Sequence, residues 1–72
     1  MDKTIYQNKY KSIVEKLKYA RLEAGLTQKQ VARKLNEPQS YISKVEAGSQ
    51  RIDIIELKTF ADLYNKAIGY FI

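Results

Sequence analysis

Apolar residues recur at helical spacing from the tenth residue of the chain onward. In the first third they lie three and four positions apart, or a further turn along, at Tyr10, Ile13, Val14, Leu17 and Ala24. This spacing places them on one face of an amphipathic helix. Gly25 follows, and glycine readily adopts the left-handed conformation that ends many helices. The pattern predicts a first helix over residues 10–24, and we expect residues 1–8 to be flexible.

A second helix is indicated by a complete set of N-terminal signals. Thr27 is a favourable N-cap, and Gln30 stands three residues later, where it can close a capping box. Leu26 and Val31 occupy the two positions of a hydrophobic staple. These signals predict a helix over residues 28–35. Its expected buried face consists of Val31, Ala32 and Leu35.

A sharp turn and a third helix are expected directly afterwards. Asn36 tolerates a positive φ better than most residues, which suits a tight turn. Pro38 has a preset φ and lacks an N–H group, so it suits the start of a helix. Gly48 is placed to end that helix. The third helix is therefore predicted over residues 39–47.

The N-terminal signals appear again at Asp53, which has Glu56 three residues later as the partner of a capping box. The helix that follows is expected to run to about Tyr64. Its predicted inward residues are Ile54, Leu57, Phe60, Ala61 and Tyr64. Residues 67–72 are mostly apolar, which is compatible with a short fifth helix or an extended tail. No stretch alternates with period two, so the expected fold class is all-α, a compact bundle of four to five short helices.

Composition narrows the function classes. The chain has 72 residues, which we expect to form a single domain over residues 1–72. It contains no Cys and no His, so thiolate metal sites, imidazole ligands and the commonest general base are excluded. Carboxylates and serines are present, but their spacing does not suggest an activated nucleophile. We expect neither an enzyme nor a bound metal or cofactor.

Positive charge is concentrated in the first two thirds of the chain. The formal net charge is +5, and residues 1–24, 25–51 and 52–72 contribute +3, +3 and −1. Such a distribution favours a polyanionic partner, although moderate charge also serves solubility. No apolar run approaches the ~20 residues of a membrane span, and the polar N-terminus does not resemble a signal peptide. We expect a soluble, cytoplasmic protein without a membrane partner.

The segment QKQVARKLNEPQSYISKVE, residues 28–46, resembles the helix-turn-helix of the phage-repressor and Cro class, the XRE type. With its flanking elements the resemblance extends over residues 10–68. It implies a lambda-repressor-like fold with a DNA-binding helix-turn-helix over residues 27–47. Two positions depart from the family pattern, because Asn36 stands where Gly is usual and Glu37 where an apolar residue is usual.

The resemblance makes the third helix the one that enters the major groove of DNA. A helical wheel centred on Ile42 and Val45 directs the polar residues of this helix outward. The expected base-contacting residues are Gln39, Ser40, Ser43 and Lys44. An ordinary solvated helix face is the alternative for the same residues.

Contacts with the DNA backbone are expected from residues on both sides of that helix. The N-terminus of the second helix offers free N–H groups to an anion, and Gln28 matches a family position that resembles a phosphate clamp. The expected backbone-contacting residues are Thr27, Gln28, Lys29, Tyr41, Ser49, Gln50 and Arg51. The alternative is that these side chains are only solvated and do not contact DNA.

Arg21 and Glu46 have a structural role in this interpretation. Each lies at the border of the apolar face of its helix. In the family that the chain resembles, the matching residues form a partly buried ion pair between the first and third helices. We expect the same pair here.

The sequence therefore predicts a regulator of transcription that binds double-stranded DNA. A repressor acting on a palindromic operator as a homodimer is the leading interpretation, with no small-molecule ligand expected. The candidate dimer residues are Ile68, Tyr70, Phe71 and Ile72, which could instead complete the monomer core. Restriction-modification controllers, antitoxin-type autoregulators and protein-interaction modules that have lost DNA binding remain the alternatives.

Overall fold

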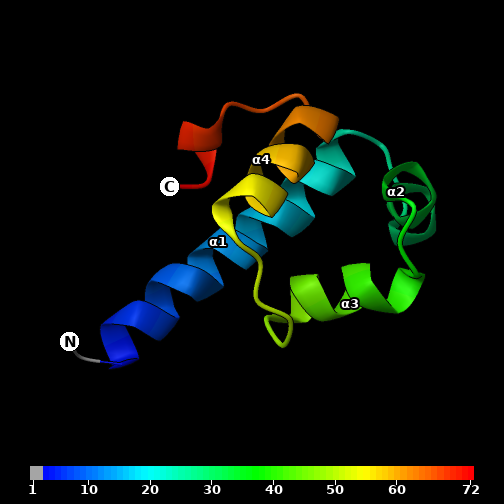
Figure 1. The fold of residues 1–72 in the computed structure, drawn as a ribbon. Coiled ribbons are helices and arrows are strands. Elements are labelled where there is room, and N and C mark those ends of the chain that lie inside the picture. Colours follow the sequence, from blue (N-terminus) through cyan, green and yellow to red (C-terminus); the bar gives the residue numbers. More distant parts are fainter. Residues whose placement is uncertain (1–2) are drawn as a thin grey trace.

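The computed structural model describes the backbone of residues 3–72 and the side chains of residues 7–72. Figure 1 shows a long first helix whose C-terminal half is crossed by α4, with α2 and α3 to the right of both. The elements in chain order are α1 (Lys3–Glu23), α2 (Gln28–Leu35), α3 (Gln39–Ala47), α4 (Ile54–Leu63) and the 3-10 helix η1 (Ile68–Tyr70). The described residues contain no strand, which confirms the predicted all-α bundle.

The predicted start of the first helix was wrong. α1 begins at Lys3 rather than at Tyr10, so residues 3–8, which we expected to be flexible, are helical, while residues 1–2 lie outside the described part. No Gly or Pro precedes Tyr10 to end the helix. The side chains of residues 7–9 are exposed, so this part of the helix has no apolar stripe that a periodicity argument could detect.

Both predicted capping boxes are present. The Thr27 hydroxyl accepts from the backbone N–H of Gln30 at 3.1 Å, and the Gln30 side chain accepts from the Thr27 N–H at 2.8 Å. Asp53 and Glu56 make the same reciprocal pair, at 2.7 and 2.9 Å. These side chains pair backbone N–H groups that would otherwise lack a partner, and they fix the starts of α2 and α4.

The turns between the helices rely on residues in the left-handed region. Asn36 has φ 56° and ψ 45°, which confirms the predicted tight turn between α2 and α3. Its backbone N–H and the next one donate back to carbonyl groups in the last turn of α2. Gly48 closes α3 with φ 79°, and Asn65 follows α4 with φ 58°.

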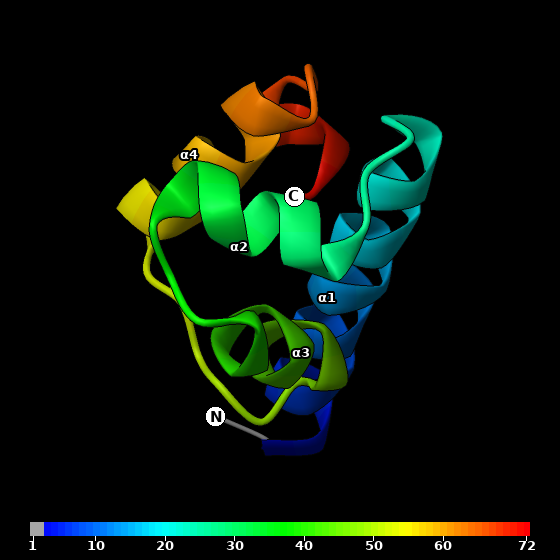
Figure 2. The same ribbon diagram turned by 90° about the vertical axis from the view of Figure 1, so that its right-hand side faces the viewer.

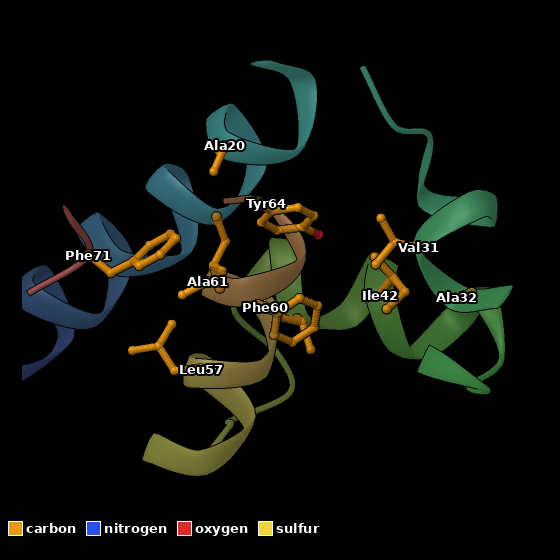
Figure 3. Packing of buried hydrophobic residues seen from close by; sticks show 11 residues of the cluster. Ala20, Val31, Ala32, Ile42, Leu57, Phe60, Ala61, Tyr64 and Phe71 are labelled. Atoms are coloured by element: carbon orange, nitrogen blue, oxygen red, sulfur yellow. The ribbon is translucent and has the colours of Figure 1, made fainter. Parts of the chain in front are cut away.

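The core lies where all four α-helices meet. Figure 3 shows Leu57, Phe60 and Ala61 of α4, with Tyr64 directly after it, facing residues from the other elements. The buried cluster is made of Leu17, Ala20, Val31, Ala32, Ile42, Val45, Leu57, Phe60, Ala61, Tyr64 and Phe71. Ile54 was predicted to point inward but is 58% exposed, because it lies in the first turn of α4 at the edge of the bundle.

The C-terminal tail folds back onto the bundle. Residues 68–70 form a single 3-10 turn, and Phe71 is 2% exposed with its ring edge-on to Tyr70. Of the two roles left open for this tail, Phe71 therefore has the core role and is not available as a dimer contact. Ile68 and Tyr70 are partly buried against the same core, whereas Ile72 is 71% exposed.

Candidate nucleic-acid interface

α2 and α3 form a helix-turn-helix. Figure 1 shows α2 nearly end-on and α3 from the side, so the two helices cross steeply. At their contact Ala32 is 4% exposed and Ile42 is fully buried. A small side chain at position 32 lets the two backbones approach each other closely. The inner face of α3 is consequently covered, and its outer face is left to solvent. Figure 2, in which α2 is seen from the side and α3 nearly end-on below it, shows the same steep crossing.

The four predicted base-contacting residues all lie on exposed positions of α3. They are Gln39, Ser40, Ser43 and Lys44, which we name the recognition face. Ile42 and Val45, between and beside them in the sequence, are buried and anchor the helix. The recognition face is thus a polar strip on a helix whose orientation is fixed by the core.

The predicted phosphate-contacting residues at the N-terminus of α2 differ in whether their side chains are already hydrogen-bonded within the protein. Thr27 uses its hydroxyl in the capping box, and Lys29 is exposed. The Gln28 amide donates to Glu46 Oε1 at 3.1 Å. Because a carboxamide nitrogen carries two N–H groups, this bond leaves Gln28 a second donor for an anion.

The loop after α3 is linked to the first helix. The Tyr10 hydroxyl donates to the carbonyl of Gln50 at 3.1 Å. The guanidinium of Arg51 lies over the Tyr10 ring, 4.9 Å from its centroid, in a cation–π arrangement. Ser49 is exposed, and its hydroxyl donates to the carbonyl of Lys44 at 3.3 Å. These contacts hold the loop beside the C-terminal end of α3.

Tyr41 is directed away from the recognition face. Its hydroxyl donates to Glu56 Oε2 at 2.7 Å, and its ring stacks on that of Phe60 with centroids 6.5 Å apart. Burial, reinforced by the bond to Glu56, raises the pKa of Tyr41 above its ordinary value. Sequence reasoning missed this link between α3 and α4, because Glu56 was assigned only to the capping box, where its other oxygen indeed serves.

Arg21 and Glu46 lie in contact beneath the helix-turn-helix. Arg21 donates from Nε to Glu46 Oε2 at 2.7 Å and from Nη2 to Oε1 at 3.1 Å. A third donor of Arg21, Nη1, bonds the carbonyl of Leu26 at 2.9 Å. The two charged side chains are 9% and 6% exposed. The hydrogen bond to Glu46 raises the pKa of Arg21, so the guanidinium stays ionised.

The comparisons with known proteins agree with this geometry. The model of the HTH_3 helix-turn-helix family matches residues 17–71, more than half of the chain. The chain belongs to this helix-turn-helix family. It is accordingly a DNA-binding regulator of transcription, in a family of regulators rather than of enzymes. No curated protein and no solved structure matches the chain.

The described residues also bear on two other kinds of site. None of the helices there has the length and apolar character needed to cross a membrane. Across the same part of the chain, no group of three or more Asp or Glu residues is arranged to hold a metal ion.

Proposed function

We propose that this protein is a sequence-specific repressor that binds a palindromic operator in double-stranded DNA as a homodimer, in the cytoplasm. The observation that carries the proposal is the recognition face, an exposed polar strip on a helix whose opposite side is buried. A helix of this kind fits the major groove, where the edges of the four base pairs are distinguishable. When bound to an operator, the protein would block the access of the transcription machinery to that DNA.

Base contacts in this proposal come from the recognition face. Gln39 begins α3, and residues at the N-terminus of a recognition helix reach deepest into the groove. Its carboxamide can pair with both polar atoms of adenine, and Lys44 can donate to O6 and N7 of guanine. Ser40 and Ser43 contribute shorter donors and acceptors on the same strip. Each well-formed contact contributes about 1–3 kcal/mol of discrimination.

Backbone contacts position the recognition face without adding sequence information. The proposed residues are Thr27, Gln28, Lys29, Ser49, Gln50 and Arg51, which flank α3 on both sides. Tyr41 is left out of this set, since its hydroxyl is engaged with Glu56 on the side of α4.

The dimer follows from the small number of base pairs that one recognition helix can contact. An apolar depression at the edge of the bundle is lined by Ile13, Ile54 and Ile72 among others. Ile54 is 58% and Ile72 is 71% exposed, so both offer apolar surface that a second copy of the chain would remove from water. The dimer contact is therefore proposed at this depression, with Ile68 and Tyr70 on the same C-terminal tail as Ile72.

Selection of bound sequences from a random DNA pool, repeated at two salt concentrations, tests the proposal. We expect a palindromic consensus whose half-sites are about one helical turn apart. Gln39→Ala and Lys44→Ala should each relax the base preference at one position of the consensus. Lys58→Ala, at an exposed position of α4, should leave the consensus unchanged. Failure of the wild-type protein to enrich any sequence would contradict the proposed function.

A further inference from the structure

Tyr41 joins the recognition helix to α4. Its hydroxyl donates to Glu56 Oε2 at 2.7 Å, and its ring stacks on the Phe60 ring with an angle of 16° between the ring planes. Phe60 is 2% exposed, so the ring on which Tyr41 stacks belongs to the core. Tyr41 is the third residue of α3, and it therefore links the N-terminal part of the recognition helix to a fixed part of α4.

A hollow lies beside this side chain. It has a volume of about 130 Å³ and lies between the end of α2, the turn that follows α2, and α4. Leu35, Glu37 and Thr59 line it together with Tyr41 and Glu56. Because side chains do not fill this hollow, close packing alone does not hold this side of α3 against α4. The bridge made by Tyr41 supplies that support.

The other end of α3 is held by a different set of contacts. Glu46, near the C-terminus of α3, accepts hydrogen bonds from Arg21 of α1 and from Gln28 of α2. The buried side chains of α3 hold the helix on the bundle through apolar contacts, which are not directional. Two directional anchors at different points along a helix restrain the direction of its axis more than one does. Glu46 is the anchor toward α1 and α2, and Tyr41 is the anchor toward α4.

The carboxylate that accepts the Tyr41 bond also fixes the start of α4. Glu56 Oε1 accepts from the backbone N–H of Asp53 at 2.9 Å, so the two oxygens of Glu56 serve different partners. Asp53 is followed by Ile54, which belongs to the proposed dimer contact. One side chain thus connects the recognition helix with the part of α4 that would face a second copy of the chain.

We propose that Tyr41 is a positioning residue that sets the spacing of the two half-sites in the operator. The inference rests on the proposed function and deepens it, because a dimer held through α4 presents its two recognition faces at a separation that depends on the angle between α3 and α4. One base pair inserted between the half-sites turns one of them by about 35° relative to the other. To contact both half-sites of such an operator, α3 would have to shift against α4 and break the bond to Glu56.

Tyr41→Phe tests the assignment, because it removes the hydroxyl and keeps the ring on Phe60. Glu56→Gln is the conservative variant, since its carbonyl oxygen can accept from the Asp53 N–H while its amide group donates to the Tyr41 hydroxyl. Tyr19→Phe is the matched control, because Tyr19 is 60% exposed on α1. Fluorescence anisotropy measures the dissociation constants for the selected palindrome, for the same palindrome with one inserted base pair, and for an isolated half-site.

The readout is the ratio of the dissociation constant for the inserted palindrome to that for the unaltered palindrome. For the wild type the ratio should exceed about 10, because binding the shifted half-site breaks a hydrogen bond to a charged group. Tyr41→Phe has no such bond to break, so its ratio should be about tenfold lower. Glu56→Gln and Tyr19→Phe should keep the wild-type ratio. Tyr41→Phe should bind the isolated half-site as the wild type does, which also shows that the variant is folded.

A wild-type ratio in Tyr41→Phe would overturn the inference and leave the proposed function in place, even if thermal unfolding showed the variant to be less stable. An equally lowered ratio in Glu56→Gln would also overturn it, because the charge of the carboxylate and not the bond to Tyr41 would then set the spacing. Equal affinity of the wild type for the two palindromes would overturn it as well, since no spacing would be fixed. Absence of DNA binding by the wild type, or binding of the palindrome as a monomer, would instead contradict the proposed function on which the inference rests.

Discussion

Glu46 is the residue at which three helices are joined. It lies near the end of α3, accepts two hydrogen bonds from Arg21 of α1 and accepts one from Gln28 of α2. Its side chain is 6% exposed, so these bonds form away from bulk water. Hydrogen bonds to a charged group at such a site are stronger than neutral ones. The carboxylate therefore sets how the recognition helix sits on the remainder of the bundle.

Replacement of Glu46 by Ala should lower the free energy of unfolding by about 3–5 kcal/mol, because it leaves the Arg21 guanidinium buried without its counter-charge. Asp62→Ala is the matched control, since it breaks an ion pair with Lys58 in which both side chains are about 60% exposed. That control should cost about 0–1 kcal/mol. Urea unfolding followed by circular dichroism measures both losses. Similar losses would show that the buried pair of Arg21 and Glu46 stabilises the protein no more than the exposed pair does.

Residue-level contacts were predictable from the sequence only where a local rule or the family resemblance applied. Arg21 and Glu46 were paired by resemblance and by their positions on the helical wheel. The bond from Tyr41 to Glu56 joins residues 15 positions apart. Periodicity indicates which side of a helix is covered, but it does not say which polar group of another helix stands opposite. The second partner of Glu46, Gln28, escaped prediction for the same reason.

At the scale of elements, local chemistry determined the boundaries. The predicted bounds of α2 and α3 agree with the structure at both ends, because each end has a capping or turn residue with a strong local preference. α1 lacks such a signal at its start. The side chains of residues 7–9 are exposed, so no apolar stripe distinguishes this part of the helix from a loop in the sequence.

The turn between α2 and α3 depends on the left-handed conformation of Asn36, which has φ 56°. Asn36→Ala should therefore destabilise the protein by about 1–2 kcal/mol, the usual cost of placing a Cβ in this region without a compensating side-chain bond. Asn36→Gly should change stability by less than about 0.5 kcal/mol. Thermal unfolding measures the difference, which corresponds to about 4–8 °C per kcal/mol for a domain of this size.

The same pair of substitutions at Asn65, which has φ 58° after α4, provides an internal repeat of this experiment. If the Ala and Gly variants at position 36 were equally stable, the left-handed conformation of this residue would not limit the stability of the turn.

The whole molecule should lose stability in alkaline solution. Burial raises the pKa of both Tyr64 and Tyr41 in the folded protein, with the charge of Glu46 adding to the effect on Tyr64 and the bond to Glu56 adding to that on Tyr41. In the unfolded chain both phenols titrate near pH ~10. Above that pH the unfolded state releases protons that the folded state retains, so the free energy of unfolding falls as pH rises.

Urea unfolding at pH 8, 10 and 11 measures this slope, which Tyr64→Phe should reduce because it removes one of the two titrating groups. Tyr19→Phe is the control, since Tyr19 is 60% exposed on α1. An unchanged slope in Tyr64→Phe would mean that other groups cause the alkaline loss.

Assembly of two copies is the last property at the molecular scale. Ile54→Ser with Ile72→Ser should weaken the proposed dimer, because both side chains lose apolar surface at the same depression. Serine adds no charge, so the electrostatic attraction to DNA stays unchanged. Leu22→Ser is the control, since Leu22 is 52% exposed on α1 and does not line the depression.

Sedimentation equilibrium should give a higher dimer dissociation constant for the double variant, while Leu22→Ser matches the wild type. On DNA the double variant should lose affinity for the full palindrome but keep its affinity for an isolated half-site, since the recognition face is untouched. A wild-type protein that remains monomeric at high concentration, both free and on the palindrome, would refute the dimer. Equal losses on the palindrome and the half-site would instead indicate that the depression supports the fold of the monomer.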